Sequence, residues 1–284
     1  MKKSIKILYL LLSIILCSYH TNAVAQEKEF GVWAGTAVFL GDLNPNMSFK
    51  NARSAMGAFF RYNFNNRMSV RTGVNYAFLQ AKDSYQKRYP YLLHRNLSFS
   101  SQIIEVGATY EINFFAYSTS GERKTKNWTP YIFGGASLFY YNPTTKLNGN
   151  KYRLEYVGTE GQKSANIQSR TKGYNSYAFA IPFGMGIKYA LNQNWALNFE
   201  VSSRYAFTDF IDDVSGVYPD INEINYYGNG VNLGELLYDR STEVGTKTGI
   251  TNKQRGTSSE KDRFLFVGVT LTYTIFETKC PKVF

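Results

Sequence analysis

Histidine and cysteine are scarce in this chain, which holds two of each among 284 residues. His20 and Cys17 fall in an N-terminal stretch that we expect to be removed, so the mature protein keeps His94 and Cys280. A single cysteine excludes a scaffold of disulfides within the chain. A single histidine excludes a histidine-rich metal site and argues against a Ser-His-Asp triad. We expect His94 to be a solvated loop residue.

Long apolar runs are also missing beyond the start of the chain, so the sequence predicts no transmembrane helix. The start has three lysines in its first six residues, an apolar run at 7–17 and an Ala-Val-Ala cleavage signal at 23–25. This order is typical of a secretory signal. We therefore expect a signal peptide at 1–25 and one exported domain at 26–284. In an alternative, Cys17 is the lipid-modified residue of a lipoprotein, but a leucine precedes it where a small residue is usual.

What the chain has in abundance is alternation of apolar and polar residues, with 17% aromatic side chains. The stretch 263–276 shows it best. Successive strand side chains point to opposite faces. Its apolar face consists of Leu265, Val267, Val269, Leu271, Tyr273 and Ile275. The other face is mostly glycine and threonine, and the run exceeds the roughly 9–11 residues with which a tilted strand crosses a bilayer.

Seven further alternating runs precede that strand. The eight runs are 30–40, 54–64, 67–79, 98–114, 128–141, 177–190, 195–207 and 263–276. Connections after the even-numbered runs are short or moderate, and those after the odd-numbered runs are longer, as in outer-membrane barrels. The predicted fold is therefore all-β: an eight-stranded antiparallel transmembrane outer-membrane β-barrel with long external loops. Both termini are expected in the periplasm. Pro182 is unusual in the sixth run because it removes a ladder donor.

Charged residues recur on the face of these strands that we expect to line the lumen. They are Arg61, Arg71, Glu105, Glu111, Lys188, Glu200 and Arg204. The side chains of an eight-stranded barrel fill its interior, and these opposite charges largely neutralise one another. We therefore expect a plugged barrel and not a pore. The alternative places the same charges on the solvent face of a soluble sandwich.

Carboxylates cluster in the longest loop, at Asp209, Asp212, Asp213 and Asp220. Carboxylates at such spacing are able to hold Ca²⁺, but the EF-hand pattern is absent and no glutamate closes the set. We expect these residues to be solvated or to cap loops. Whether the first three bind a cation stays open, and the sequence predicts no metal site and no cofactor.

No convincing catalytic constellation is present, so we expect no enzyme. A carboxylate dyad near the external rim stays open as the alternative for a barrel enzyme. The net charge of +11 does not indicate nucleic-acid binding, because the basic residues are scattered through loops of an exported protein. Basic loops such as 122–127 are suited to acidic partners or lipid headgroups.

Several stretches in a fixed order resemble a known family. They are EFGVWAGTAVFLGDLNP, FFRYNFNNRMSVRTGVNYA, TPYIFGGASLFYYNP, LEYVGTEGQ, AIPFGMGIKYALNQNWALNFEV, TDFIDDVSGVY, QRG, VGVTLTYTI and CPKVF. From about residue 29 to residue 284 the chain is similar to the PorG family of the type IX (Por) secretion system of Bacteroidota. The resemblance implies an integral outer-membrane barrel, surrounded by outer-membrane lipid, that associates with a periplasmic ring of the lipoprotein PorK and the protein PorN. It implies a role in protein secretion and, in some species, gliding motility, and it brings no catalytic residues.

From the predicted topology we place the ring contact on the periplasmic connections and the tail. The contact residues we expect there are Cys280, Arg123, Lys124 and Lys126. Two interpretations of Cys280 stay open: a disulfide to a partner protein, and a structural or unreactive thiol. The alternative function is that of a small OmpA/OmpX-like barrel for surface adhesion or protection.

Overall fold

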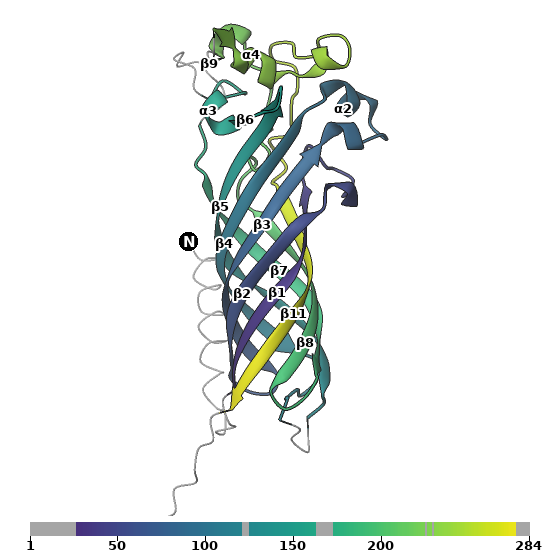
Figure 1. Ribbon diagram of the computed structural model, residues 1–284, viewed down its shortest axis with the longest axis vertical. Helices are drawn as coiled ribbons and strands as arrows, with labels where there is room; N and C mark the ends of the chain where they lie inside the picture. The colour runs from purple at the N-terminus through teal and green to yellow at the C-terminus, as the bar shows by residue number, and fades with distance from the viewer. Residues whose placement is uncertain (1–26, 121–124, 163–172, 225, 229, 277–284) are drawn as a thin grey trace, which may run out of the picture.

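The computed structural model describes residues 27–120, 125–162 and 173–276, apart from residues 225 and 229. The expected signal peptide and the tail after Phe276 lie outside this range. Strands dominate the described part and form one tall cylinder with helices and short strands gathered at one end (Figure 1).

Eight long antiparallel strands form the cylinder. They are β1 (Glu27–Leu40), β2 (Arg53–Asn63), β3 (Met68–Lys82), β4 (Ser98–Asn113), β5 (Trp128–Leu147), β7 (Tyr177–Ala190), β8 (Trp195–Ala206) and β11 (Arg263–Phe276). Their order in the sheet is β4-β3-β2-β1-β11-β8-β7-β5, and β4 also pairs with β5. This last pairing closes the sheet, so the predicted eight-stranded barrel is confirmed. β11 pairs with β1 along its whole length, from Glu27 opposite Phe276 to Leu40 opposite Arg263.

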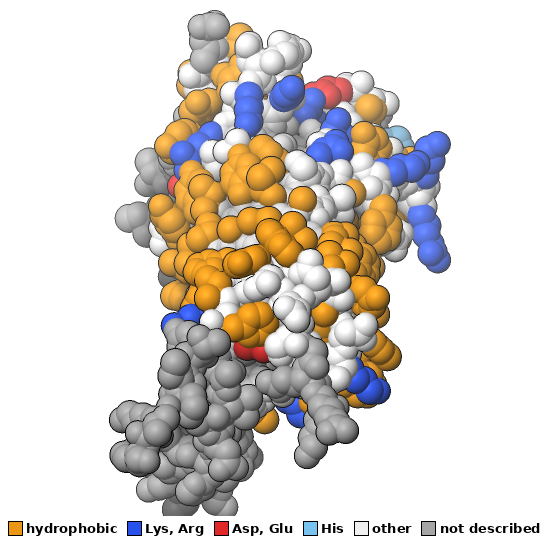
Figure 2. All heavy atoms as spheres, turned by 60° about the horizontal axis from the view of Figure 1, so that its bottom comes forward, with side chains coloured by type: hydrophobic (Ala, Val, Ile, Leu, Met, Phe, Trp, Pro, Cys, Tyr) orange, Lys and Arg blue, Asp and Glu red, His pale blue; other side chains and the backbone are white. Residues whose placement is uncertain are grey.

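The outside of the barrel is an apolar belt. Outward residues from the middle of every strand expose large aliphatic or aromatic side chains, among them Val32, Met56, Val74, Val106, Leu138, Met185, Phe199 and Val269. Hydrophobic side chains form a nearly continuous band on the face in Figure 2. A folded protein in water does not leave so much contiguous apolar surface uncovered, whereas the hydrocarbon of a bilayer requires it.

Aromatic pairs mark both borders of this belt. At the end near the chain termini, Trp195 packs on Tyr273 and Phe115 on Trp128, with ring centres 5.0 and 5.2 Å apart. At the other end, Tyr76 pairs with Phe78 and Tyr140 with Tyr177, at 5.1 and 5.2 Å. Two aromatic girdles around an apolar band are the exterior of an outer-membrane-type barrel. No helix in the described part of the chain is long and apolar enough to cross a membrane.

Glycine occurs beside large side chains at several inward positions, which leaves room for those side chains in the lumen. A Cβ on Gly31 would collide with the ring of Phe59, and a Cβ on Gly57 would collide with the indole nitrogen of Trp33. Each glycine therefore makes room for an aromatic side chain from a neighbouring strand. This explains why glycine recurs on the inner face of strands that otherwise carry bulky residues.

The two ends of the barrel differ. At one end the β2–β3 and β7–β8 turns use the same device: the side-chain oxygen of Asn65 or Asn192 accepts two backbone N–H groups of the residues that follow. Such side-chain-to-backbone bonds are the reason that asparagine favours tight turns. The β4–β5 connection and both ends of the barrel segment lie at this end, which we call the turn end.

At the opposite end the longer connections form a cap. Its elements are η1 (Phe49–Asn51), η2 (Asp83–Tyr85), α2 (Pro90–Arg95), β6 (Asn150–Arg153), α3 (Leu154–Val157), η3 (Ile221–Glu223), β9 (Tyr227–Gly228), β10 (Val231–Asn232), α4 (Leu233–Tyr238) and η4 (Ser241–Glu243). We call this the cap end. The predicted alternation of short and long connections holds except at one place: the β4–β5 connection, residues 114–127, is longer than the β1–β2 connection, residues 41–52.

One strand differs clearly from its predicted length. β5 continues to Leu147, beyond the predicted end at Tyr141, and forms a hairpin with β6. The predicted strand ended before Asn142 and Pro143. In the structure Pro143 continues the strand and pairs with β4 alone, because β7 begins opposite Tyr140. Proline is tolerated where one side of a strand is free. Pro182 lies within β7 with its side chain buried, and the β5–β7 register has the same offset on both sides of it.

Candidate functional site

The lower lumen, on the side of the turn end, holds a network of buried ion pairs centred on Glu111. The carboxylate of Glu111 lies 2.9 Å from a guanidinium nitrogen of Arg61, 3.1 Å from one of Arg71 and 2.7 Å from Nζ of Lys188. Glu111 and Arg61 have no exposed side-chain surface. One carboxylate thus contacts three cations, which come from β2, β3 and β7.

Arg71 links this centre to a second carboxylate higher in the lumen. It donates to Glu200 over 2.6 Å, and the hydroxyl of Tyr131 donates to the same carboxylate over 2.8 Å. Glu105 and Arg204 form a third pair, with 3.3 Å between the closest atoms. All seven charged residues predicted to line the lumen therefore point inward, and these ion pairs connect them into two groups.

Sequence reasoning missed one member of the network. Glu29, in β1, pairs with Arg61 at 2.5 Å and accepts from Asn63. With Glu29 the lumen set has four carboxylates against four cations. The predicted strand began at residue 30, so Glu29 was not assigned to either face of the barrel. Its alternation with the apolar Phe30 was the signal that it belonged to the strand.

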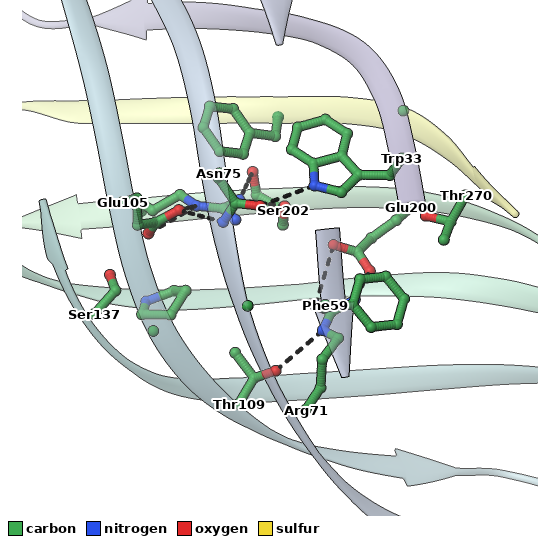
Figure 3. Close-up of a pocket in the computed structure, with 16 residues that line it drawn as sticks. Trp33, Phe59, Arg71, Asn75, Glu105, Thr109, Ser137, Glu200, Ser202 and Thr270 are labelled. Carbon is green, nitrogen blue, oxygen red and sulfur yellow. Dashed lines mark hydrogen bonds and ion pairs between the residues drawn. The ribbon is translucent and has the colours of Figure 1, made fainter. Parts of the chain in front are cut away.

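Between these pairs lies a small polar cavity of about 50 Å³. Figure 3 shows side chains from several strands around it. The indole of Trp33 donates to Asn75 over 2.8 Å, and Asn75 donates to Glu105 over 2.8 Å. A cavity of this size holds only a few water molecules. It is too small for a substrate or a transported solute.

Above the ion pairs the lumen is filled by aromatic rings. Phe39, Phe99, Phe139 and Phe264 are buried. The rings of Phe39 and Phe99 meet edge to face with their centres 4.8 Å apart, and those of Phe139 and Phe264 do so at 5.5 Å. Ion pairs therefore close the lumen in the half near the turn end, and aromatic side chains close it in the half near the cap end. In this conformation it is not a pore.

Of the predicted contact residues at the turn end, the structure describes Lys126. Its backbone pairs with Tyr117, and its ammonium group lies 3.9 Å from the centre of the Phe115 ring. Lys126 is therefore fixed at the aromatic girdle with its charge at the membrane border, where lysine side chains favour the interface. Arg123, Lys124 and Cys280 lie outside the described residues.

The sequence of this barrel matches the model of a protein family. A model described as "Domain of unknown function (DUF6089)" matches residues 6–236. The chain belongs to the DUF6089 family. No curated protein matches its sequence.

The DUF6089 chain is also similar to solved structures. Neisserial surface protein A (NspA) is 12% identical with a TM-score of 0.37, covering 89% of this chain and 99% of that one. Ail, the attachment invasion locus protein of Yersinia pestis, is 9% identical with a TM-score of 0.38, covering 89% and 100%. The outer membrane protein OprG from Pseudomonas aeruginosa is 9% identical with a TM-score of 0.38, covering 89% and 97%. At these values the likeness concerns the barrel fold and not function.

The cap of the DUF6089 chain is held together by buried ions that join its separate connections. Arg95 binds Asp83 through two nitrogens at 2.7 and 2.8 Å and donates to the backbone carbonyl of Arg255. Arg255 pairs with Glu160 at 2.9 Å and donates to the carbonyl of Asp213. Arg95 also donates to the backbone carbonyl of Asp42 over 3.0 Å, so all four connections at the cap end are linked and the cap is not a set of independent loops.

The aspartates of the longest connection are buried in this cap, so the expectation that they are solvated was wrong for three of four. Asp209, Asp212 and Asp213 are at most 4% exposed. The capping role is present: Asp212 accepts from the backbone N–H of Val214, and exposed Asp220 accepts from that of Asn222. In the described part of the chain, no group of three or more His, Cys, Asp and Glu residues is arranged to hold a metal ion. His94 lies exposed in the last turn of α2.

Burial changes the acidity of these carboxyls. Desolvation raises the pKa of Asp209 to about 7, with the nearby carboxylate of Asp42 adding to it, while Ser215 and Lys261 act in the opposite direction. Desolvation raises the pKa of Asp213 to about 6 against the opposing charge of Arg255. The pKa of Asp212 is raised well above its usual value by burial and by the facing carboxyl of Asp262.

Raising the pH from about 5 to about 8 is therefore expected to loosen the cap. These carboxyls bind protons more tightly in the folded cap than in the unfolded chain, where the pKa is near 3.9. Their contribution to stability is fully present below about pH 4 and is lost as the pH rises through about 6 to 7. Amide exchange is itself faster at higher pH, so the quantity to compare is protection relative to the unfolded chain at the same pH. That protection should be lower for residues 209–215 at the higher pH. Asp209→Asn should reduce the difference and Asp220→Asn should leave it, and equal protection of wild type at both pH values would contradict the assignment.

Proposed function

We propose that this DUF6089 chain is a non-enzymatic anchor in the outer membrane that holds the periplasmic PorK/PorN ring of a type IX protein secretion system. In this proposal the turn end faces the periplasm and the cap end faces outward. The protein would support secretion and, in some species of Bacteroidota, gliding motility.

The observation that carries the proposal is the sealed lumen. A barrel filled by buried ion pairs and aromatic rings passes no cargo, so its contribution to transport is to hold other components in place through its surface. The ordered stretches that resemble the PorG family point to the ring as the component held.

The turn end is the surface we propose for that contact. Glu27 at the start of β1 lies opposite Phe276 at the end of β11, so both ends of the described barrel lie together at the turn end, with the tight turns at Asn65 and Asn192. In the proposed orientation this end delivers the tail with Cys280 to the periplasm, where a disulfide to a partner protein is able to form.

Affinity isolation of the tagged protein from detergent-solubilised membranes tests the proposal. A ring lipoprotein and its periplasmic partner should be recovered together with the barrel. A variant that lacks the residues after Phe276 should recover less of them while it still folds as a barrel. Recovery of the intact barrel without either ring protein, and with a surface ligand bound, would favour a small adhesion barrel instead.

A further inference from the structure

A groove on the outer surface of the barrel, just beyond the apolar belt at the cap end, is lined by basic and neutral polar side chains. It has a volume of about 570 Å³ and lies over the outer ends of β3, β4 and β5 and the start of β6. Its cations are Arg53, Lys82, Lys146, Lys151 and Arg240. No aspartate or glutamate is among the lining residues that the structure describes.

The groove is continuous with the belt below it. On β3 the outward row runs from Val74 and Tyr76 through Phe78 to Lys82, and on β5 it runs from Leu138 and Tyr140 to the groove residue Lys146. Lys82 lies four residues beyond Phe78 on β3, which is about 13 Å along the strand. A molecule whose hydrocarbon lies against the belt would therefore place its headgroup in the groove.

Two lysines in the groove repel each other when no anion lies between them. Lys146 on β5 and Lys151 on β6 are direct partners across the hairpin, and both are exposed. Like charges directly opposite each other in an antiparallel pair destabilise it. Within the described part of the chain neither lysine has an acidic group within ion-pair distance. An anion between them would relieve the repulsion.

Hydrogen bonds to neighbouring groups fix the positions of the two arginines at the rim of the groove. Glu243 binds Arg240 through two nitrogens at 2.8 and 3.0 Å, which aims its remaining nitrogen at the hydroxyl of Ser98, 3.1 Å away. Arg53 is held by Gln80 over 2.7 Å. Hydroxyls and amides between the cations supply the donors and acceptors that a sugar requires.

We propose that this groove binds the phosphorylated sugar headgroup of a glycolipid in the surrounding leaflet, with Lys146 and Lys151 on the phosphate. Three features converge on this occupant: positive charge for phosphate, neutral polar groups for sugar, and continuity with the lipid-facing belt for acyl chains. The inference uses the outer-membrane location from the proposed function but not the contact with the ring.

Binding of purified full-length mature protein in detergent to lipid A tests this, with dephosphorylated lipid A and inorganic phosphate as the comparison probes. Wild type should bind lipid A, bind the dephosphorylated lipid much more weakly, and melt at a higher temperature when lipid A is present. Lys146→Gln with Lys151→Gln should weaken lipid A binding about thirtyfold, the effect of removing two basic residues beside an anionic surface. The control, Lys87→Gln with Lys253→Gln, removes equal charge from exposed cap positions outside the groove and should bind as wild type does.

Misfolding cannot imitate the expected result, because without lipid the groove variant should melt no lower than wild type once the lysine repulsion is gone. Equal binding of lipid A by the groove and control variants would overturn the proposal. Equal binding of the two lipids by wild type would overturn the role of phosphate. Protection by inorganic phosphate equal to that by lipid A would assign the groove to free phosphate and overturn the glycolipid. None of these outcomes depends on recovery of the ring proteins.

Discussion

Replacing Glu111 by alanine is expected to destabilise the barrel by about 3–5 kcal/mol, the cost of breaking a buried ion pair by removing one partner. Glu111 contacts Arg61, Arg71 and Lys188, and it is fully buried. Without it, three cations share the remaining carboxylates in a space with no room for bulk water. The free energy of unfolding in urea, measured in detergent or vesicles, reports the loss.

Glu235→Ala is the matched control, because it removes the same charge from the exposed surface of α4. It should change the unfolding free energy by less than about 0.5 kcal/mol. The double variant Glu111→Ala with Lys188→Met should lose less than the sum of its single losses, since one unpaired cation is gone. Strict additivity, or a loss no larger than that of the control, would show that Glu111 is not the centre of the lumen network.

Placing an arginine at Val269 is expected to destabilise the membrane-inserted barrel by about 2–4 kcal/mol. Val269 lies in the middle of β11, and its side chain is 46% exposed on the apolar belt. A guanidinium at this depth must stand in hydrocarbon or draw water and headgroups toward it. Folding into lipid vesicles, followed by the shift in electrophoretic mobility between folded and unfolded barrel, measures the effect.

Ile275→Arg is the control for that experiment, because it lies on the same face of β11 near the aromatic girdle. The cost should fall there to about 0–1 kcal/mol, since an arginine near the interface reaches water. Equal costs at the two positions would contradict the depth assigned to the strand. A tolerated arginine at Val269 would overturn the assignment of this face to lipid.

The barrel itself could be predicted from sequence because a membrane imposes a strict pattern on each strand. Lipid on one side and a packed lumen on the other require alternation at every step, and Val269 and Thr270 show it in adjacent residues. The boundaries of β11 and β7 were predicted to the residue. The error at β5 arose because the strand continues past the membrane, where Pro143 lies against a single neighbour and the alternation rule no longer applies.

The cap was far less predictable. Its stability comes from contacts between connections distant in sequence, such as Arg95 with the carbonyl of Arg255 and Glu160 with the side chain of Arg255. No local pattern announces such pairs, so the aspartates at 209–213 looked like a hydrophilic loop and are instead buried. The groove was missed for a related reason. Lys146 and Lys151 face each other only because β5 and β6 form a hairpin. The strand predicted from the sequence ended at residue 141, before this hairpin.

The most direct test of the proposed anchoring role is crosslinking resolved by the end of the barrel. A photoreactive residue placed at Arg67 or Gln193 reports on the turn end, and one placed at Tyr91 or Lys151 reports on the cap; all four side chains are exposed. If the turn end holds the ring, adducts with a ring lipoprotein or its periplasmic partner should form in intact cells from the turn end and not from the cap. Ring adducts from the cap positions, or no protein adduct from a correctly folded barrel labelled at the turn end, would contradict it.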